Sequence, residues 1–169
     1  VNKLSNELQV DVDTAKEILA EYNDKVPFVK ELTKRISNLA NDDGNVATIK
    51  GRKCRFEMWE PSTFGMNKAM QYEEAKAIYG NNIRRAFTYK ALNRLIQGSA
   101  ADQTKQAMID CHKAGYMPLL QIHDELCFSI NEESDIPSVK NIMENAIDTL
   151  KVPSKVDIAI GKSWGEAKE

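Results

Sequence analysis

Between residues 119 and 130 the chain reads LLQIHDELCFSI, an apolar run that three consecutive ionisable residues interrupt. Apolar residues alternate after the interruption, as they do in a half-buried strand. A hairpin with His123 and Asp124 at its tip fits this pattern. Its arms pack in a core, and its tip holds a carboxylate at an edge where a hard divalent cation can bind. Three polar residues between apolar runs are also common as an ordinary turn, so this stretch alone leaves both interpretations open.

The composition of the 169-residue chain narrows the class of protein only slightly. The formal net charge is −2, yet basic residues gather around positions 50–55 and 84–94. Such clusters either bind phosphates or form solvated faces.

Cys54, Cys111 and Cys127 lack metal-ligand spacing, which argues against a disulfide framework or a zinc site and indicates a reducing compartment. No apolar run approaches the roughly 20 residues that span a bilayer, and no secretory signal is present, so we expect a cytoplasmic chain without a membrane partner.

The apolar periodicity predicts an α+β fold with an antiparallel sheet. The first part is predicted to be helical over residues 4–19 with a break and cap at 11–13, then over 27–40. A turn at 41–45, a hairpin at 46–56, a loop at 61–65 and a helix at 66–79 follow. A long helix is predicted over 83–114, ending at Gly115. The hairpin described above, a helix over 137–150 and a last strand over 156–160 complete the order.

The predicted long helix contains a second informative stretch, Ala91 to Asp102, which reads ALNRLIQGSAAD. Asn93 and Gln97 are four residues apart, so they share a helical face, and their amides suit the acceptors of a DNA minor groove. Residues 98–101 are small and allow another backbone to approach closely. A glycine inside a helix costs about 1 kcal/mol relative to alanine, so Gly98 needs a packing or contact reason. On the spacing alone, a polar helix face with small residues packed against a sheet is the preferred explanation, because nothing in the spacing requires DNA.

Together these motifs resemble the C-terminal palm of family A DNA polymerases, the family of bacterial DNA polymerase I and related phage enzymes. The resemblance rests on residues 93–102 followed by His123-Asp124-Glu125. It extends to Thr48–Lys53, which is similar to the family's Gly-Arg-Arg hairpin, and to Gly161–Gly165, which is similar to its Gly-x-x-Trp ending. The resemblance implies a fingers-derived helical segment with a short hairpin over residues 1–82. It implies a palm segment that carries motif C over residues 83–169.

The resemblance also implies roles for particular residues. Asp124 corresponds to the motif C carboxylate that binds the two catalytic Mg²⁺ ions, and Glu125 and His123 correspond to its catalytic neighbours. Asn93, Gln97 and Arg52 correspond to contacts with primer–template DNA. The family usually has an arginine eight residues before the glutamine, where this chain has Tyr89. The implied reaction is template-directed transfer of nucleotides from dNTPs to a primer 3′-hydroxyl.

The resemblance leaves one catalytic acid unassigned. Two-metal phosphoryl transfer uses acids from separate segments, and in this family the second aspartate comes from motif A. We therefore expect either the C-terminal part of a split polymerase, as in phages, completed by an N-terminal fragment with motifs A and B, or an inactive DNA-binding remnant. A third interpretation is a fragment of one longer polypeptide. A metal-dependent hydrolase is disfavoured because Cys54, Cys111, Cys127 and His112 offer no convergent ligand set.

Overall fold

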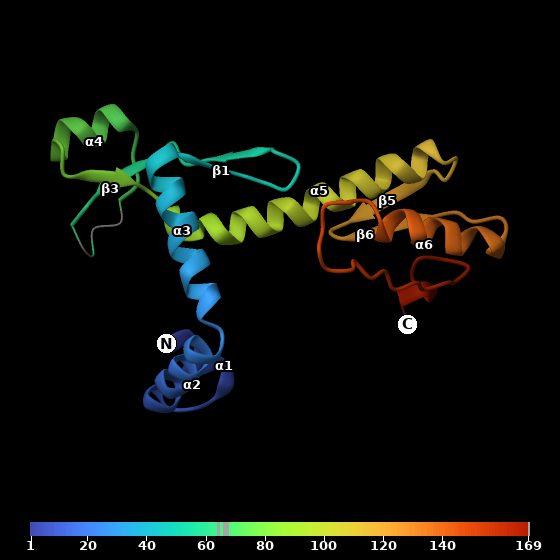
Figure 1. Ribbon diagram of the computed structural model, residues 1–169, viewed down its shortest axis with the longest axis horizontal. Helices are drawn as coiled ribbons and strands as arrows, with labels where there is room; N and C mark the ends of the chain where they lie inside the picture. The colour runs from blue at the N-terminus through green and yellow to red at the C-terminus, as the bar shows by residue number, and fades with distance from the viewer. Residues whose placement is uncertain (64, 66–67, 169) are drawn as a thin grey trace. The chain divides into compact units, whose positions relative to one another are not determined.

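The computed structural model describes residues 1–63, 65 and 68–168, and Figure 1 shows the order of its elements. Contacts divide the chain into two compact units. Residues 1–47 and 53–95 form the first unit, and residues 48–52 form the second unit together with residues 96 onward. Helices and small antiparallel sheets alternate in the chain, which confirms the predicted α+β class.

The first unit begins with three helices, α1 (Asn2–Leu8), α2 (Val12–Lys25) and α3 (Pro27–Asp43). The Asp11 carboxylate caps α2 by accepting hydrogen bonds from the backbone N–H groups of Asp13 and Thr14, each at 2.9 Å. Proline occupies the first position of α3, where a missing N–H costs nothing. The helix runs to Asp43 and ends at Gly44 with φ 70°, so the turn predicted at residues 41–45 begins later than expected.

Two short antiparallel pairs follow in the first unit, β1 (Asn45–Ala47) with β2 (Lys53–Arg55) and β3 (Trp59–Pro61) with β4 (Ile83–Arg85). The first pair confirms the predicted hairpin. The second corrects two predictions, because residue 61 ends a strand and residues 83–85 are a strand rather than the start of the long helix. An ion pair between Arg84 and Glu60, 2.9 Å from Nε to Oε1, joins the two strands.

Helix α4 (Tyr72–Tyr79) is shorter than the predicted helix over 66–79. The backbone of Met70 instead pairs with that of Trp59 through two hydrogen bonds of 2.8 Å, so α4 begins only after this bridge. Part of that prediction, residues 66 and 67, lies outside the described residues. The helix ends at Gly80, as the sequence predicts.

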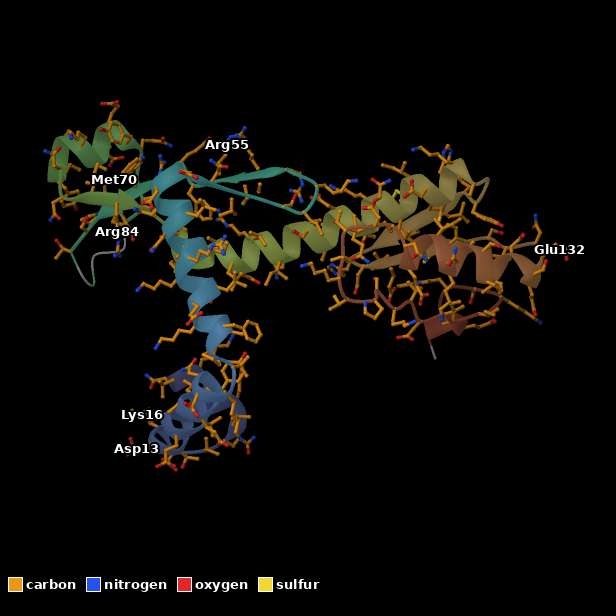
Figure 2. All side chains as sticks on the ribbon, in the orientation of Figure 1. Asp13, Lys16, Arg55, Met70, Arg84 and Glu132 are labelled. Carbon is orange, nitrogen blue, oxygen red and sulfur yellow. The ribbon has the colours of Figure 1, made fainter. Side chains whose placement is uncertain are left out.

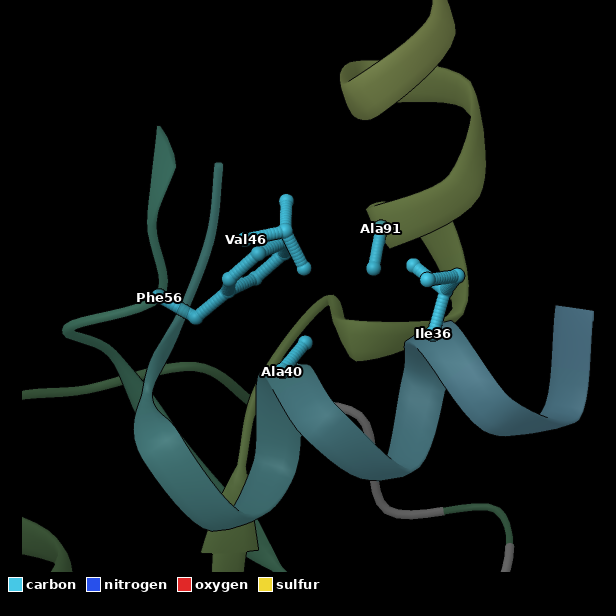
Figure 3. Packing of buried hydrophobic residues seen from close by; sticks show 5 residues of the cluster. All are labelled: Ile36, Ala40, Val46, Phe56 and Ala91. Atoms are coloured by element: carbon cyan, nitrogen blue, oxygen red, sulfur yellow. The ribbon is translucent and has the colours of Figure 1, made fainter. Parts of the chain in front are cut away.

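A cluster of buried residues holds the first unit together. Figure 3 shows its members, which come from α3, β1, the segment after β2 and the start of α5: Ile36, Ala40, Val46, Phe56 and Ala91. The guanidinium of Arg94 lies 4.9 Å from the centre of the Phe56 ring. Burial of these apolar side chains stabilises the unit by removing their surface from water.

Helix α5 (Ala91–Lys113) follows a short 3-10 helix at Thr88–Lys90, so the long helix begins eight residues later than predicted. Phe87 precedes both with φ 63°, a left-handed conformation that no α-helix contains, and this explains the late start. At the other end Gly115 has φ 93°, and the Tyr116 N–H donates to the Cys111 carbonyl at 2.9 Å. This end confirms the predicted glycine cap.

The second unit contains most of α5, the hairpin of β5 (Pro118–Ile122) and β6 (Glu125–Phe128), α6 (Ile136–Glu144), and short 3-10 helices at Glu133–Asp135 and Glu166–Lys168. Figure 2 labels Glu132, which lies between β6 and α6. Helix α6 ends at Glu144 rather than at 150, and the predicted strand over 156–160 is wrong, since these described residues form no strand. The Val156 N–H donates to the Glu144 carboxylate at 3.1 Å instead of to a neighbouring strand. None of the helices within the described residues is long and apolar enough to cross a membrane.

Candidate functional site

The hairpin of β5 and β6 places the three ionisable residues at its tip. Ile122 pairs with Glu125, so His123 and Asp124 form a two-residue turn between the strands. His123 has φ 55°, a conformation in which histidine is enriched relative to most non-glycine residues. The Gln121 side-chain amide donates to the His123 carbonyl at 3.1 Å and braces the turn. The hairpin predicted from residues 119–130 is therefore confirmed, with its tip where the sequence places it. Its arms do not pack in a core as predicted, because every residue of β5 and β6 is exposed or half-buried.

The side chains of His123, Asp124 and Glu125 are all exposed at this tip. Asp124 belongs to the turn, whereas Glu125 is the first residue of β6, so the two carboxylates are not equivalent in position. Carboxylate oxygens are the hard ligands that Mg²⁺ prefers, and one or two of them are enough when waters and substrate phosphates complete the shell. The donor chemistry of the tip therefore fits Mg²⁺. Within the described part of the chain, no group of three or more His, Cys, Asp or Glu residues gathers into a metal-binding cluster.

The two predicted minor-groove residues lie on helix α5. Asn93 belongs to the first unit and Gln97 to the second, and both side chains are exposed. Tyr89, which stands where the family usually has arginine, is 69% exposed. The neighbouring Lys90 ammonium lies 5.5 Å from the centre of its ring. The polar face that the sequence predicts is therefore open to solvent.

Arg52, the third predicted DNA contact, has protein partners. Its Nε donates to the Asp102 carboxylate at 2.8 Å and its Nη2 to the Gly98 carbonyl at 2.9 Å. The Thr48 hydroxyl donates to the other oxygen of the same carboxylate. The Ile49 N–H donates to the Ser99 hydroxyl at 3.0 Å. Residues 48–52, the tip of the β1–β2 hairpin, are thus fastened to α5.

Asp102 is the buried centre of this network, with a side chain only 8% exposed. Burial raises the pKa of its carboxyl. Hydrogen bonds from Thr48 and Arg52, together with the charges of Arg52 and Lys105, outweigh burial and hold this pKa below its ordinary value. The carboxylate is therefore ionised at neutral pH and available as a double acceptor.

The same contacts explain the glycine inside α5. A Cβ on Gly98 would lie 2.9 Å from Cγ2 of Thr48, closer than real Cβ atoms come to a neighbour. The sequence predicts that another backbone approaches the small residues 98–101. The structure brings residues 48–52 there, with the backbone N–H of Ile49 at Ser99 and the side chains of Thr48 and Arg52 at Gly98. Sequence reasoning missed Asp102 and Thr48. The available signal was the position of Asp102 four residues after Gly98, on the same helical face.

The chain is similar to known DNA polymerases over nearly its whole length. The family model described as DNA polymerase family A matches residues 1–166, so the chain belongs to DNA polymerase family A. Among curated relatives, the DNA-directed DNA polymerase of Pseudomonas phage M6 is 38% identical over 150 residues, which cover 89% of this chain and 19% of that protein. DNA polymerase I of Lactococcus lactis subsp. cremoris is 34% identical over 174 residues, which cover 98% of this chain and 18% of that protein.

A solved structure shows the same likeness. The POL domain of Pol1 from M. smegmatis, in complex with DNA primer-template and dNTP, matches with a TM-score of 0.70 and 30% identity. The match covers 98% of this chain and 28% of that chain. The resemblance predicted from the sequence is thereby confirmed. The chain spans less than a fifth of the length of the two curated relatives.

Proposed function

We propose that this chain forms the C-terminal part of the active site of a DNA-directed DNA polymerase. The observation that carries the proposal is the exposed Asp124 at a two-residue hairpin tip, in a chain that matches the family over residues 1–166. In the proposed reaction, nucleotides from dNTPs are transferred to the 3′-hydroxyl of a primer paired with its template. The proposed assignment of domains is a fingers-derived segment over residues 1–82 and a palm segment over 83–169.

In this proposal Asp124 holds Mg²⁺, and Glu125 assists from the start of β6. Two such ions, when bound, stabilise the attacking and leaving oxygens of an in-line displacement. His123 sits beside this carboxylate and orients the primer terminus through its imidazole. The left-handed backbone at His123 keeps the turn to two residues, so the imidazole and the carboxylate come from adjacent positions of the hairpin tip.

Primer–template DNA is the proposed partner of α5. The exposed amides of Asn93 and Gln97 can each donate to the acceptors that every base pair presents in the minor groove. Recognition of this kind is independent of sequence, as a polymerase requires. Arg52 is proposed to contribute to DNA binding as well, and the way in which it does so is treated below.

The proposed site is completed by motifs A and B from residues outside these 169, on an N-terminal fragment or on the same polypeptide. The acid of motif A would hold the metal ions together with Asp124, since two-metal sites draw their acidic ligands from separate segments. The chain covers less than a fifth of the length of each of the two curated relatives, which supports this proposal.

A primer-extension assay tests the proposal. The chain is assayed with Mg²⁺, dNTPs and a labelled primer–template, alone and together with a segment that carries motifs A and B. We expect extension only by the complemented mixture. The variant Asp124→Asn keeps the shape of the side chain and removes its charge, so extension should fall by about two to three orders of magnitude, the equivalent of several kcal/mol of lost metal-ion stabilisation.

The matched control is Glu132→Gln, which removes an exposed acid outside the hairpin and should leave extension unchanged. Undiminished extension by the Asp124→Asn mixture would refute the catalytic role of Asp124. If the wild-type mixture binds primer–template but does not extend the primer, the chain is a DNA-binding remnant. Extension by the wild-type chain alone would show that the second carboxylate lies within these 169 residues.

A further inference from the structure

The contacts of residues 48–52 determine which cations of this loop are available to DNA. The guanidinium of Arg52 is engaged by a carboxylate and a backbone carbonyl of α5. Lys50, two residues before it, is exposed and forms no ion pair with any described residue. Gly51, the next residue, has φ 78°, and a Cβ at this position would have nothing within 4 Å of it, so the turn at Lys50 and Gly51 is uncrowded. Of these two cations, Lys50 is therefore the one positioned for an external anion.

The loop is fixed in place by several bonds at once. Asp102 accepts from Thr48 and Arg52, the Arg52 N–H donates to the Thr48 hydroxyl at 3.1 Å, and the Ile49 N–H donates to Ser99. We name the bonds that join Thr48 and Arg52 to Asp102 and Gly98 the loop latch. Thr48 and Asp102 are buried, so loss of either one leaves the other without this partner, which is costlier than the absence of both.

The place where the loop is fixed connects it to the proposed DNA-binding face. Its partners on α5 are Gly98, Ser99 and Asp102, which directly follow the exposed Gln97 in the same unit. A side chain that reads a minor groove at Gln97 has phosphates on either side of it, because the groove is bordered by the two backbones. The loop that carries Lys50 is bound to Gly98 and Ser99, the two residues that follow Gln97.

We infer that the loop latch is a positioning device for DNA binding, in which Arg52 and Asp102 hold the loop on α5 so that Lys50 binds a phosphate of the primer–template duplex. Arg52 is thus a positioning residue and Lys50 the direct contact. The inference rests on the proposed DNA-binding function and deepens it, since it assigns the roles of two cations that sequence reasoning could not separate.

The test measures duplex binding against salt concentration, with the complemented chain and a labelled primer–template. Lys50→Gln should lower the slope of log K against log salt by about 0.9, the value for one phosphate contact. Arg52→Lys should lose as much affinity as Arg52→Gln, because lysine cannot bridge a carboxylate and a carbonyl as the planar guanidinium does. Asp102→Asn should weaken binding too, and adding Arg52→Gln to it should cost little more, since both act through one latch.

A direct phosphate contact by Arg52 predicts the opposite pattern. Arg52→Lys would then keep nearly the wild-type affinity and slope, and Asp102→Asn would leave binding equal or tighter because it frees the guanidinium. Lys50→Gln would change the slope no more than the charge-matched control Lys151→Gln, an exposed lysine after α6. That set of results would overturn the inference.

A measurement without DNA separates this inference from the proposed function. Hydrogen exchange at the Ile49 and Arg52 amides should become faster in Arg52→Gln and Asp102→Asn and stay unchanged in Lys50→Gln. The Ile49 amide donates to Ser99 of α5 and the Arg52 amide to the Thr48 hydroxyl, so both bonds depend on the loop being held in place. Unchanged exchange in Asp102→Asn would refute the latch. A wild-type mixture that binds no duplex would refute the proposed function, whatever the exchange rates show.

Discussion

At the scale of single residues, His123 holds a conformation that its own Cβ disfavours. Its φ of 55° lies in the left-handed region, which costs an L-residue about 1–2 kcal/mol. We predict that the free energy of unfolding of His123→Gly is about 1 kcal/mol higher than that of His123→Ala. This is the reverse of the usual ranking, in which alanine is the more stabilising of the two residues. Urea denaturation of the two variants measures the difference.

The same pair of variants separates strain from chemistry at the hairpin tip. Both lack the imidazole, so primer extension by the complemented mixture should fall equally in the two. His123→Asn is the control for the backbone, because asparagine tolerates left-handed φ better than alanine. A His123→Ala variant as stable as His123→Gly would mean that the turn relaxes without the imidazole and that the left-handed backbone carries no cost.

Gly44 has a positive φ, and the guanidinium of Arg85 leaves no room for a side chain there. A Cβ there would lie 2.6 Å from Cζ of Arg85, whose guanidinium donates to the carbonyls of Asn41 and Phe56. Gly51 has a similar φ and open space around it. We predict that Gly44→Ala destabilises the chain by about 1–2 kcal/mol more than Gly51→Ala, the value of two displaced hydrogen bonds. Equilibrium unfolding in urea compares the two.

Removal of the neighbour supplies the control for this prediction. In an Arg85→Ala background the crowding is gone, so Gly44→Ala should cost only the backbone strain that Gly51→Ala also costs. An unchanged cost in that background would show that the guanidinium of Arg85 is not what makes Gly44 irreplaceable.

At the scale of secondary-structure elements, the cap of α2 gives the chain a pH-dependent stability. The Thr14 hydroxyl, followed by the Thr14 and Asp13 backbone N–H groups, holds the pKa of the Asp11 carboxyl below its ordinary value of 3.8. A lowered folded pKa stabilises the helix fully above the unfolded value, and this contribution disappears as the pH falls through the folded one. We predict that the helix content of the wild type decreases between pH 4 and pH 2 more than that of Asp11→Asn.

Circular dichroism across this range measures the effect, since asparagine caps the helix without titrating. The control is Asp13→Asn, which removes the exposed partner of Lys16, an ion pair of 2.8 Å whose residues Figure 2 labels. An exposed pair of this kind contributes little. An acid transition that is identical in the wild type and in Asp11→Asn would show that Asp11 does not contribute to it.

The elements that local sequence specifies were predictable, and those that distant partners specify were not. Asp11 before an apolar period and Gly115 after one mark helix ends through their own chemistry, and both predictions are confirmed. Strand β4 was missed because its partner β3 is more than twenty residues earlier and each strand has only three residues. The alternation over 156–160 predicted a strand, but alternation forms one only where a neighbouring backbone offers hydrogen bonds.

The candidate site also has one part that local sequence specifies and one part that distant partners specify. The hairpin tip at Asp124 follows from one continuous stretch of sequence, because the alternation and the interruption are adjacent. The bond between Arg52 and Asp102 joins residues fifty positions apart, and nothing local marks either as the partner of the other. The family resemblance therefore assigned Arg52 to a DNA contact, whereas the structure links its guanidinium to α5.

At the scale of the whole molecule, the two compact units differ in how they bury apolar surface. The first holds the cluster around Val46 and Phe56. In the second, every residue of β5 and β6 is exposed or half-buried, and Leu119 is 66% exposed. Since apolar burial is the dominant stabilising term, we predict that the second unit opens at a lower free energy than the first.

The free cysteines report on each unit separately. Cys54 of β2 packs against the cluster of the first unit, and Cys127 of β6 lies in the second unit, both half-buried. Thiol labelling in increasing urea should modify Cys127 at lower urea than Cys54, with rates normalised to those in full denaturant. Cys111 should react last under native conditions, because burial, and then the charge of Asp110, raises the pKa of its thiol and keeps it neutral. Labelling of Cys54 and Cys127 with one common dependence on urea would mean that the two units open together, against this prediction.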